Sequence, residues 1–276
     1  MNKVIKISNK LYWNTISDFL SFWFDEDRFP NQSDQETFDL YYKNYRKNFN
    51  PYIRYHYENQ SKEIVGAIKK TPNLKLLDIG SGCGSESLYF AYLGAEVTAI
   101  DITLERLSVA IARKKVLHDL NIYLKLDYVY SSIFDFSGTF NFIWLEQTFH
   151  HIEPRESIYQ KFNELLPKGG RVFISEANGW NLLIQLQLLY QTGWKTKITL
   201  LDKNGNLIPY GNERITVPFF LIKEFKTHGF DVEKVRYFRM FPNFNLPVFW
   251  LKFENFLISV FPFLATHYNI VFKKVR

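Results

Sequence analysis

A short stretch with three glycines and one carboxylate holds the residues of this chain best suited to binding a ligand. It reads Leu76-Leu77-Asp78-Ile79-Gly80-Ser81-Gly82-Cys83-Gly84, an apolar strand that runs into a glycine loop. Glycine permits positive φ angles and close approach to the backbone, so the loop predicts a cradle for a cofactor. Asp78 would repel a phosphate group but suits a cationic, amino-acid-like ligand, whose ammonium group needs acceptors.

Two common nucleotide-binding loops do not match this stretch. A dinucleotide fingerprint, G-x-G-x-x-G, would place its third glycine at position 85, where the chain has Ser85. A Walker loop would follow Gly84 with Lys and then Ser or Thr, whereas the chain continues Ser85-Glu86-Ser87. The loop is therefore predicted to hold something other than a phosphate.

A second acid ends the next apolar segment. After a helical stretch from Ser85 to Leu93, the strand pattern of residues 96–100 leads to Asp101. A carboxylate at this position can accept hydrogen bonds from both hydroxyl groups of a ribose, as in dinucleotide enzymes. Together with Asp78 and the shortened glycine loop, the pattern resembles class I S-adenosylmethionine-dependent methyltransferases, with residues 76–84 as their first motif and Asp101 as the acid of the next.

The resemblance continues in register as far as a fifth strand at residues 171–175. Residues 128–133 resemble the third strand and the loop that flanks adenine, with Ser131-Ser132 in place of the usual Gly-Asp. Residues 140–146 resemble the fourth strand, with Asn141 in place of an aspartate. Several motifs in the right order make the resemblance specific, and S-adenosylmethionine is the cofactor it implies.

The resemblance also implies which residues hold that cofactor. Ser132 would meet the adenine amino group, and Ile133 would stack on the ring. Apart from the resemblance, most aromatic residues of the N-terminal segment are interpreted as packing, and the sharper hypothesis is that Tyr45, Arg46 or Arg54 closes over the cofactor's carboxylate, an arginine through two hydrogen bonds. The expected cofactor-binding residues are Asp78, Gly80, Ser81, Gly82, Gly84, Asp101, Ile102, Ser132, Ile133, Glu146, Arg46 and Arg54.

Two adjacent histidines follow the fourth strand, near where the methyl group should point. His150 and His151 have the pKa range needed to take a proton from an acceptor hydroxyl. Glu176, at the end of the fifth strand, would orient the base, and sugar and natural-product O-methyltransferases that resemble this region use a histidine with such an acid. The alternative is that each histidine caps the following turn or binds the backbone. His150, His151 and Glu176 are the expected catalytic residues.

Composition bounds the remaining function classes. The chain of 276 residues has one cysteine, Cys83, so it has no disulfide framework and no cysteine-based zinc cluster, and no metal is expected. Cys83 is interpreted as a small residue of the loop rather than a reactive thiol. Residues 1–20 lack the apolar core and the cleavage site of an export signal, so a cytoplasmic location is expected.

Nucleic acid is the less favoured substrate. The net charge of +6 is mild, and its clusters, including residues 113–115, are interpreted as solvated faces. Base-methylating enzymes of this superfamily tend to carry Asn/Asp-Pro-Pro-aromatic after the fourth strand, where this chain reads Glu146-Gln147-Thr148-Phe149. A small-molecule acceptor is therefore expected.

The elements that position these residues form an α/β fold. We expect a doubly wound, Rossmann-like sheet of seven strands, mostly parallel with one antiparallel strand, preceded by a helical N-terminal cap of three helices. Asn204-Gly205 signals a hairpin in a late insert that would hang over the mouth of the site. The expected parts are the cap at 1–70, the S-adenosylmethionine-binding core at 71–178, a substrate lid at 179–217 and the C-terminal part of the fold at 218–276.

Residues 241–264 combine many aromatic side chains with few charges. Pro247 and Pro262 interrupt the segment, and Lys252 and Glu254 lie in its middle, so it is not expected to span a membrane. A helix packed on the core is favoured. The alternative is a wall for a lipid-like acceptor or a surface that rests on a membrane.

The sequence thus predicts a methyltransferase that acts on a small molecule, with oxygen as the favoured acceptor atom in a sugar, a natural product or a lipid-like compound. Two alternatives stay open. One is an RNA- or DNA-directed methyltransferase. The other is a cofactor-binding protein without transferase activity, which the departures at Ser132 and Asn141 would favour. No residue pattern encodes the acceptor or the oligomeric state.

Overall fold

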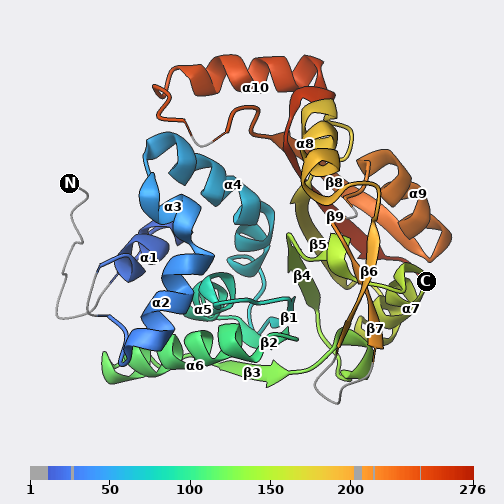
Figure 1. The fold of residues 1–276 in the computed structure, drawn as a ribbon. Coiled ribbons are helices and arrows are strands. Elements are labelled where there is room, and N and C mark those ends of the chain that lie inside the picture. The colour runs from blue at the N-terminus through green and yellow to red at the C-terminus, as the bar shows by residue number, and fades with distance from the viewer. Residues whose placement is uncertain (1–11, 26–27, 202–206, 214, 243) are drawn as a thin grey trace.

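A seven-stranded sheet forms the centre of the molecule in the computed structural model, which describes the chain except residues 1–11, 26–27, 202–206, 214 and 243 (Figure 1). The strand order is β3-β2-β1-β4-β5-β9-β8. The strands are β1 (Lys75–Ile79), β2 (Glu96–Asp101), β3 (Leu126–Tyr130), β4 (Phe142–Glu146), β5 (Arg171–Ala177), β8 (Phe230–Phe238) and β9 (His267–Lys274). The first five are parallel, and β9 inserts antiparallel between β5 and β8. This confirms the predicted fold class.

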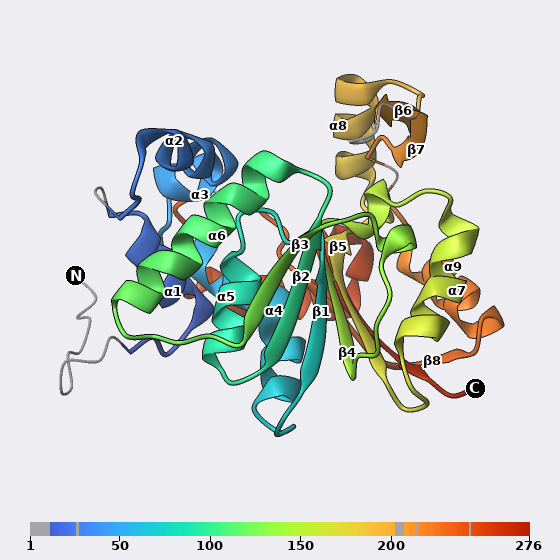
Figure 2. The ribbon, with the colours of Figure 1, turned by 90° about the horizontal axis from the view of Figure 1, so that it is seen from below.

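Helices cover both faces of the sheet, as expected where parallel strands read as continuous apolar runs. Successive residues of a strand point to opposite faces, so Leu76 joins one core cluster and Leu77 the other. One face carries α4 (Pro51–Ile68), α5 (Ser85–Tyr92) and α6 (Leu104–Asp119), and the other carries α7 (Arg155–Leu165) and α9 (Pro218–Thr227) (Figure 2).

The N-terminal cap contains four helices within the described residues, where three were predicted. They are α1 (Ile16–Trp23), α2 (Gln32–Tyr41), the short α3 (Lys43–Lys47) and α4. The backbone of Tyr42 (φ −98°, ψ 17°) leaves the helical region and divides α2 from α3. Side chains of Thr15, Asn31 and Asn50 accept hydrogen bonds from backbone N–H groups at the starts of α1, α2 and α4.

The third strand begins earlier than the sequence indicates. Residues 128–133 were interpreted as this strand and the loop after it, whereas β3 already begins at Leu126; it ends at Tyr130, and the loop leads into a 3-10 turn, η1 (Ile133–Asp135). The hydroxyl of Ser132 accepts a hydrogen bond from the N–H of Phe134 and so begins that turn.

The late insert consists of α8 (Leu182–Thr192) and a two-stranded hairpin of β6 (Lys197–Leu201) and β7 (Leu207–Gly211). Asn204-Gly205 lies outside the described residues, although the strands that flank it pair antiparallel as the hairpin signal predicts. Residues 241–264 contain α10 (Trp250–Val260) and the turn η3 (Pro262–Leu264). No helix in the described part of the chain is long and apolar enough to cross a membrane. The four part boundaries stay predictions.

Candidate active site

The glycine loop between β1 and α5 is enclosed so tightly that only glycine fits. Gly80, Gly82 and Gly84 have φ angles of 74°, 53° and 79°, in the left-handed region. A Cβ atom at each position would collide with a nearby side chain, Thr148 at Gly80, Tyr41 at Gly82 and Tyr128 at Gly84. The loop therefore lies between the end of α2 and the turn that follows β4.

A buried cation holds the loop against the N-terminal cap. Arg113 of α6 is fully buried, and its guanidinium donates to the carbonyl of Cys83 (2.6 Å) and to Oγ of Ser85 (3.0 Å). The guanidinium also lies 4.5 Å from the ring centroid of Trp23 in α1. The expectation that residues 113–115 form a solvated face is wrong for Arg113, because α6 turns this position toward the cap and the loop.

Three carboxylates gather beside the loop. Asp78 is buried, its Oδ2 has no hydrogen-bond partner among the described residues, and burial raises its pKa well above the usual value, with Glu86 adding to the effect. Burial, and then the charge of Glu86, likewise raise the pKa of Glu146. Tyr57 donates to Glu86 (2.7 Å) and Gln60 to Glu146 (2.9 Å). Such a set of acids creates a negative potential that favours a cationic ligand.

The expected ribose acid is buried and contacts the loop directly. Oδ2 of Asp101 accepts a hydrogen bond from the N–H of Gly82 (2.8 Å), and Oδ1 accepts one from Thr103 (2.8 Å). Ile102, the next residue, is exposed, whereas Ile133 is buried in a core cluster. The carboxyl ends of the adjacent strands β1, β2 and β3 thus carry Asp78 with the loop, Asp101 and Ser132, and Glu146 ends β4 beside them.

The three candidates for the cofactor's carboxylate have different surroundings. Arg46 forms an ion pair with Asp39, and Arg54 forms one with Asp18 of α1 (2.5 Å). The structure therefore gives both arginines acidic partners within the cap. The hydroxyl of Tyr45 contacts Gln60 (3.4 Å), which in turn donates to Glu146. Tyr45 is thus linked by hydrogen bonds to the carboxylates beside the loop.

His150 and Glu176 form a buried pair at the ends of β4 and β5. The turn η2 (Phe149–His151) follows β4 and places Nδ1 of His150 2.5 Å from Oε2 of Glu176. Oε1 of Glu176 accepts a hydrogen bond from the backbone N–H of Phe149 (2.7 Å). Burial alone would lower the pKa of His150, but the charge of Glu176 and its hydrogen bond raise that pKa above the usual value. Glu176 therefore fixes the ring of His150 and increases its basicity.

His151 contacts the late hairpin rather than the sheet. Its Nδ1 donates to the carbonyl of Gly211 (2.8 Å), and its ring stacks on Tyr210 at 4.6 Å between centroids. Burial, and then the neighbouring His150, lower the pKa of His151. The hairpin reaches the histidines because Ile152 and Tyr210 form an isolated antiparallel bridge.

Sequence reasoning missed Glu213, which also lies at the histidines. Its Oε2 is 3.5 Å from Nε2 of His150, and its Oε1 is 3.9 Å from Nε2 of His151. The position follows β7, far from the histidines along the chain. The only sequence signal for it was the expectation that the insert hangs over the mouth of the site.

Comparison with known proteins identifies the family of this chain. Residues 46–235 match the family model described as a methyltransferase domain. The ubiquinone biosynthesis O-methyltransferase of Xanthomonas euvesicatoria is 32% identical over 130 residues, which are 46% of this chain and 49% of that protein. The namesake from Xanthomonas axonopodis is 32% identical over 120 residues, 42% of this chain and 48% of that protein. The chain thus spans about half the length of the curated relatives it matches.

Solved structures share the fold at low identity. The alignment with the magnesium protoporphyrin IX methyltransferase of Synechocystis PCC 6803 with bound SAM covers 96% of this chain and 100% of that chain, at 12% identity and a TM-score of 0.55. The alignment with a SAM-dependent methyltransferase from Methanosarcina mazei covers 74% of this chain and 94% of that chain, at 18% identity and a TM-score of 0.54. This chain therefore belongs to the methyltransferase domain family and has the fold of S-adenosylmethionine-dependent methyltransferases.

Proposed function

We propose that this protein methylates a hydroxyl group of a small, lipid-like acceptor, with S-adenosylmethionine as the methyl donor and His150 as the base. The observation that carries the proposal is the buried pair of His150 and Glu176 next to the glycine loop. Thr148, two residues before His150, touches the loop at Gly80. The base and the cofactor cradle are therefore neighbours on adjacent strands.

The residues beside the loop suit the cofactor in charge and in hydrogen-bonding capacity. Asp78 Oδ2, Ser81 Oγ and Gln147 Nε2 are buried polar atoms without a partner in the described part of the chain, so they have hydrogen-bonding capacity for a ligand. The acids Asp78 and Glu146 suit its ammonium and sulfonium charges. Once bound, the cofactor supplies an electrophilic methyl group, and the protein has to align the acceptor and accept its proton.

His150 is equipped for that proton transfer. With Nδ1–H held by Glu176, the lone pair of Nε2 is the acceptor for the proton of a bound hydroxyl. Glu176 in turn keeps its orientation through the N–H of Phe149. We assign Glu176 as a positioning residue, and we infer that His151 shapes the mouth through Gly211 and Tyr210.

Two observations support a lipid-like acceptor. The curated relatives are named ubiquinone biosynthesis O-methyltransferases. This chain exposes large apolar side chains on α8 and around α10, and no residue of α8 is buried. They are Trp180, Leu182, Leu183, Leu186, Tyr190 and Trp194, together with Phe244, Val248, Phe249, Phe253, Phe256, Val260, Phe261 and Phe263.

We further propose that this apolar surface of α8 and α10 rests on a membrane with anionic lipids, where a lipid-like acceptor would be found. Asn181, the N-cap of α8, donates to the carbonyl of Leu264 (3.0 Å), so α8 and the turn after α10 are held together. Residues 178–201 contain no acid, and the one acid of residues 241–264, Glu254, is fully buried. Exposed Lys195 and Lys252 complete a surface that is apolar and positive.

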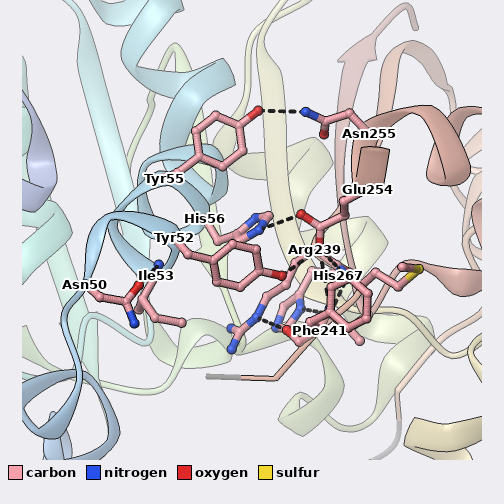
Figure 3. Close-up of polar contacts among 12 residues, drawn as sticks. Asn50, Tyr52, Ile53, Tyr55, His56, Arg239, Phe241, Glu254, Asn255 and His267 are labelled. Atoms are coloured by element: carbon pink, nitrogen blue, oxygen red, sulfur yellow. Dashed lines mark hydrogen bonds and ion pairs between the residues drawn. The ribbon is translucent and has the colours of Figure 1, made fainter. Parts of the chain in front are cut away.

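A buried polar cluster fixes α10 in place (Figure 3). Glu254 accepts hydrogen bonds from the hydroxyl of Tyr52 (2.7 Å) and the N–H of Met240 (2.6 Å), and it pairs with Nε2 of His56 (3.0 Å). The helix therefore presents its aromatic side chains on a rigid support that includes α4 and the chain after β8.

The test of the proposed chemistry separates turnover from cofactor binding. Methyl transfer would be followed as S-adenosylhomocysteine formation with a panel of phenols that differ in the length of an apolar tail. His150→Ala should lower turnover by about 10² to 10⁴-fold with little change in cofactor affinity, whereas Asp101→Ala should mainly weaken cofactor binding. Equal turnover in the wild type and the His150 variant would refute the base assignment.

A further inference from the structure

We infer that His150, His151 and Glu213 form a binding site for one divalent transition-metal ion, a site that joins the late hairpin to the turn after β4. The donor atoms are Nε2 of each histidine and a carboxylate oxygen of Glu213, and all of them lie within 4.8 Å of one another. Ligands at about 2.0 to 2.1 Å from a tetrahedral ion lie about 3.4 Å apart. Nε2 of His150 is 3.5 Å from Oε2 of Glu213, and Nε2 of His151 is 3.9 Å from Oε1, so each histidine is near that spacing from one of the two carboxylate oxygens.

The protein already holds both rings in the form that a metal needs. Metal-binding histidines usually donate the N–H of the other ring nitrogen to a carboxylate or a carbonyl, which fixes the ligating nitrogen. Here Nδ1 of His150 faces Glu176, and Nδ1 of His151 faces the carbonyl of Gly211. Both Nε2 lone pairs are therefore directed away from these partners. The outer shell of a metal site is in place before any ion binds.

The third donor comes from a position where the backbone is constrained. Glu213 has a φ of 51°, which is rare for a residue with a side chain. Gly211, two residues earlier, lies so close to the carbonyl of His150 that a Cβ there would collide with it. The hairpin is thus packed directly on the turn that carries the histidines, and this contact places Glu213 beside them.

Two imidazoles and one carboxylate select the class of ion. Mg²⁺ and Ca²⁺ prefer sets made only of oxygen, whereas imidazole suits Zn²⁺, Co²⁺, Ni²⁺ and Fe²⁺. Three protein ligands leave one coordination position open, as in catalytic rather than structural zinc sites. The site would accordingly bind a zinc-class ion with one exchangeable position.

This inference rests on geometry alone and does not depend on the proposed methyl transfer. If both are correct, the ion and the acceptor's proton compete for Nε2 of His150. A zinc-class ion would then inhibit methyl transfer by the base route, and chelation would restore it.

The test is a titration of the untagged, metal-stripped chain with Co²⁺, whose visible absorption is strong in tetrahedral coordination. We expect one ion per chain, a raised melting temperature, and displacement of Co²⁺ by Zn²⁺. His151→Ala and Glu213→Gln should each weaken binding at least as much as the 10 to 100-fold that loss of an outer-shell partner costs.

A matched control tests whether a surface histidine outside the site binds the metal ion. His118 lies 3.8 Å from Asp119 on the exposed side of α6, so His118→Ala removes a surface histidine with an acid beside it. That variant should bind Co²⁺ as the wild type does. Absence of binding, or binding that survives both His151→Ala and Glu213→Gln, would overturn the site, and neither result would bear on the methyl-transfer proposal.

Discussion

The side chain of Thr148 lies directly over Gly80, so close that a Cβ on the glycine would collide with it. This contact joins the glycine loop after β1 to the turn after β4 that carries His150. Because β1 and β4 are hydrogen-bonded neighbours, a shift of either segment would move the glycine loop relative to His150. This one side-chain contact therefore couples the position of the loop to that of the proposed base, and methyl transfer depends on such alignment.

Gly80→Ala should abolish cofactor binding, because the new methyl group would push Thr148 and the loop apart. Gly94→Ala is the matched control, since Gly94 also has a positive φ (101°) but no atom lies within 4 Å of the place that a Cβ would take. Each alanine should cost about 1 to 3 kcal/mol of stability through backbone strain. Calorimetric titration with S-adenosylmethionine should show binding to the Gly94 variant only. Loss of binding in both variants would mean that strain, rather than the contact, is responsible.

Binding of S-adenosylmethionine should release protons. Because their pKa values are raised, Asp78 and Glu146 keep their protons to a higher pH in the free protein than an exposed carboxyl does, and a cationic ligand favours their ionised forms. Affinity should therefore fall as pH falls through these raised pKa values. Titrations in buffers of different ionisation enthalpy would measure the release.

S-adenosylhomocysteine is the control for that measurement, because its sulfur carries no charge and its binding should release fewer protons.

The same two carboxyls also affect how the stability of the free protein depends on pH, and they act in the opposite direction from carboxyls whose pKa is lowered by folding. Its folded state binds protons that the unfolded chain has lost, so these two groups make it less stable as pH rises through their raised pKa values. Heats of S-adenosylmethionine binding that are the same in every buffer would count against proton release by these carboxyls.

Glu254→Ala should destabilise the protein by on the order of 3 kcal/mol, since it leaves the buried Tyr52 hydroxyl, the N–H of Met240 and His56 without their acceptor. Asn255→Ala, on the exposed side of the same helix, removes one hydrogen bond to Tyr55 and should change stability by about 0.5 kcal/mol or less. Chemical denaturation of both variants tests the difference. Equal stability would show that the cluster does not anchor α10.

The sequence was most informative where function depends on residues close together in the chain. Asp78, the glycines and Asp101 each lie at the end of a short apolar run, so strand order alone predicts that they meet. Contacts between distant segments left no such signal. Glu213 meets the histidines only because the hairpin folds back, and Arg113 looks like a surface charge until α6 packs under the cap. Likewise, Glu254 counted as a charge against membrane insertion, while its partners Tyr52 and His56 lie in the N-terminal cap.

Liposome co-sedimentation tests the apolar surface of α8 and α10. The wild type should sediment with vesicles that contain phosphatidylglycerol and much less with purely zwitterionic vesicles, because the exposed lysines attract anionic lipid. Phe253→Ser with Phe256→Ser should reduce binding, since both side chains are exposed on α10, 47% and 63% respectively. Tyr123→Ser removes an aromatic side chain that is 70% exposed outside this surface and should have no effect. Wild-type protein that stays in the supernatant with both kinds of vesicle would refute membrane docking, and the aromatic face would then need another partner.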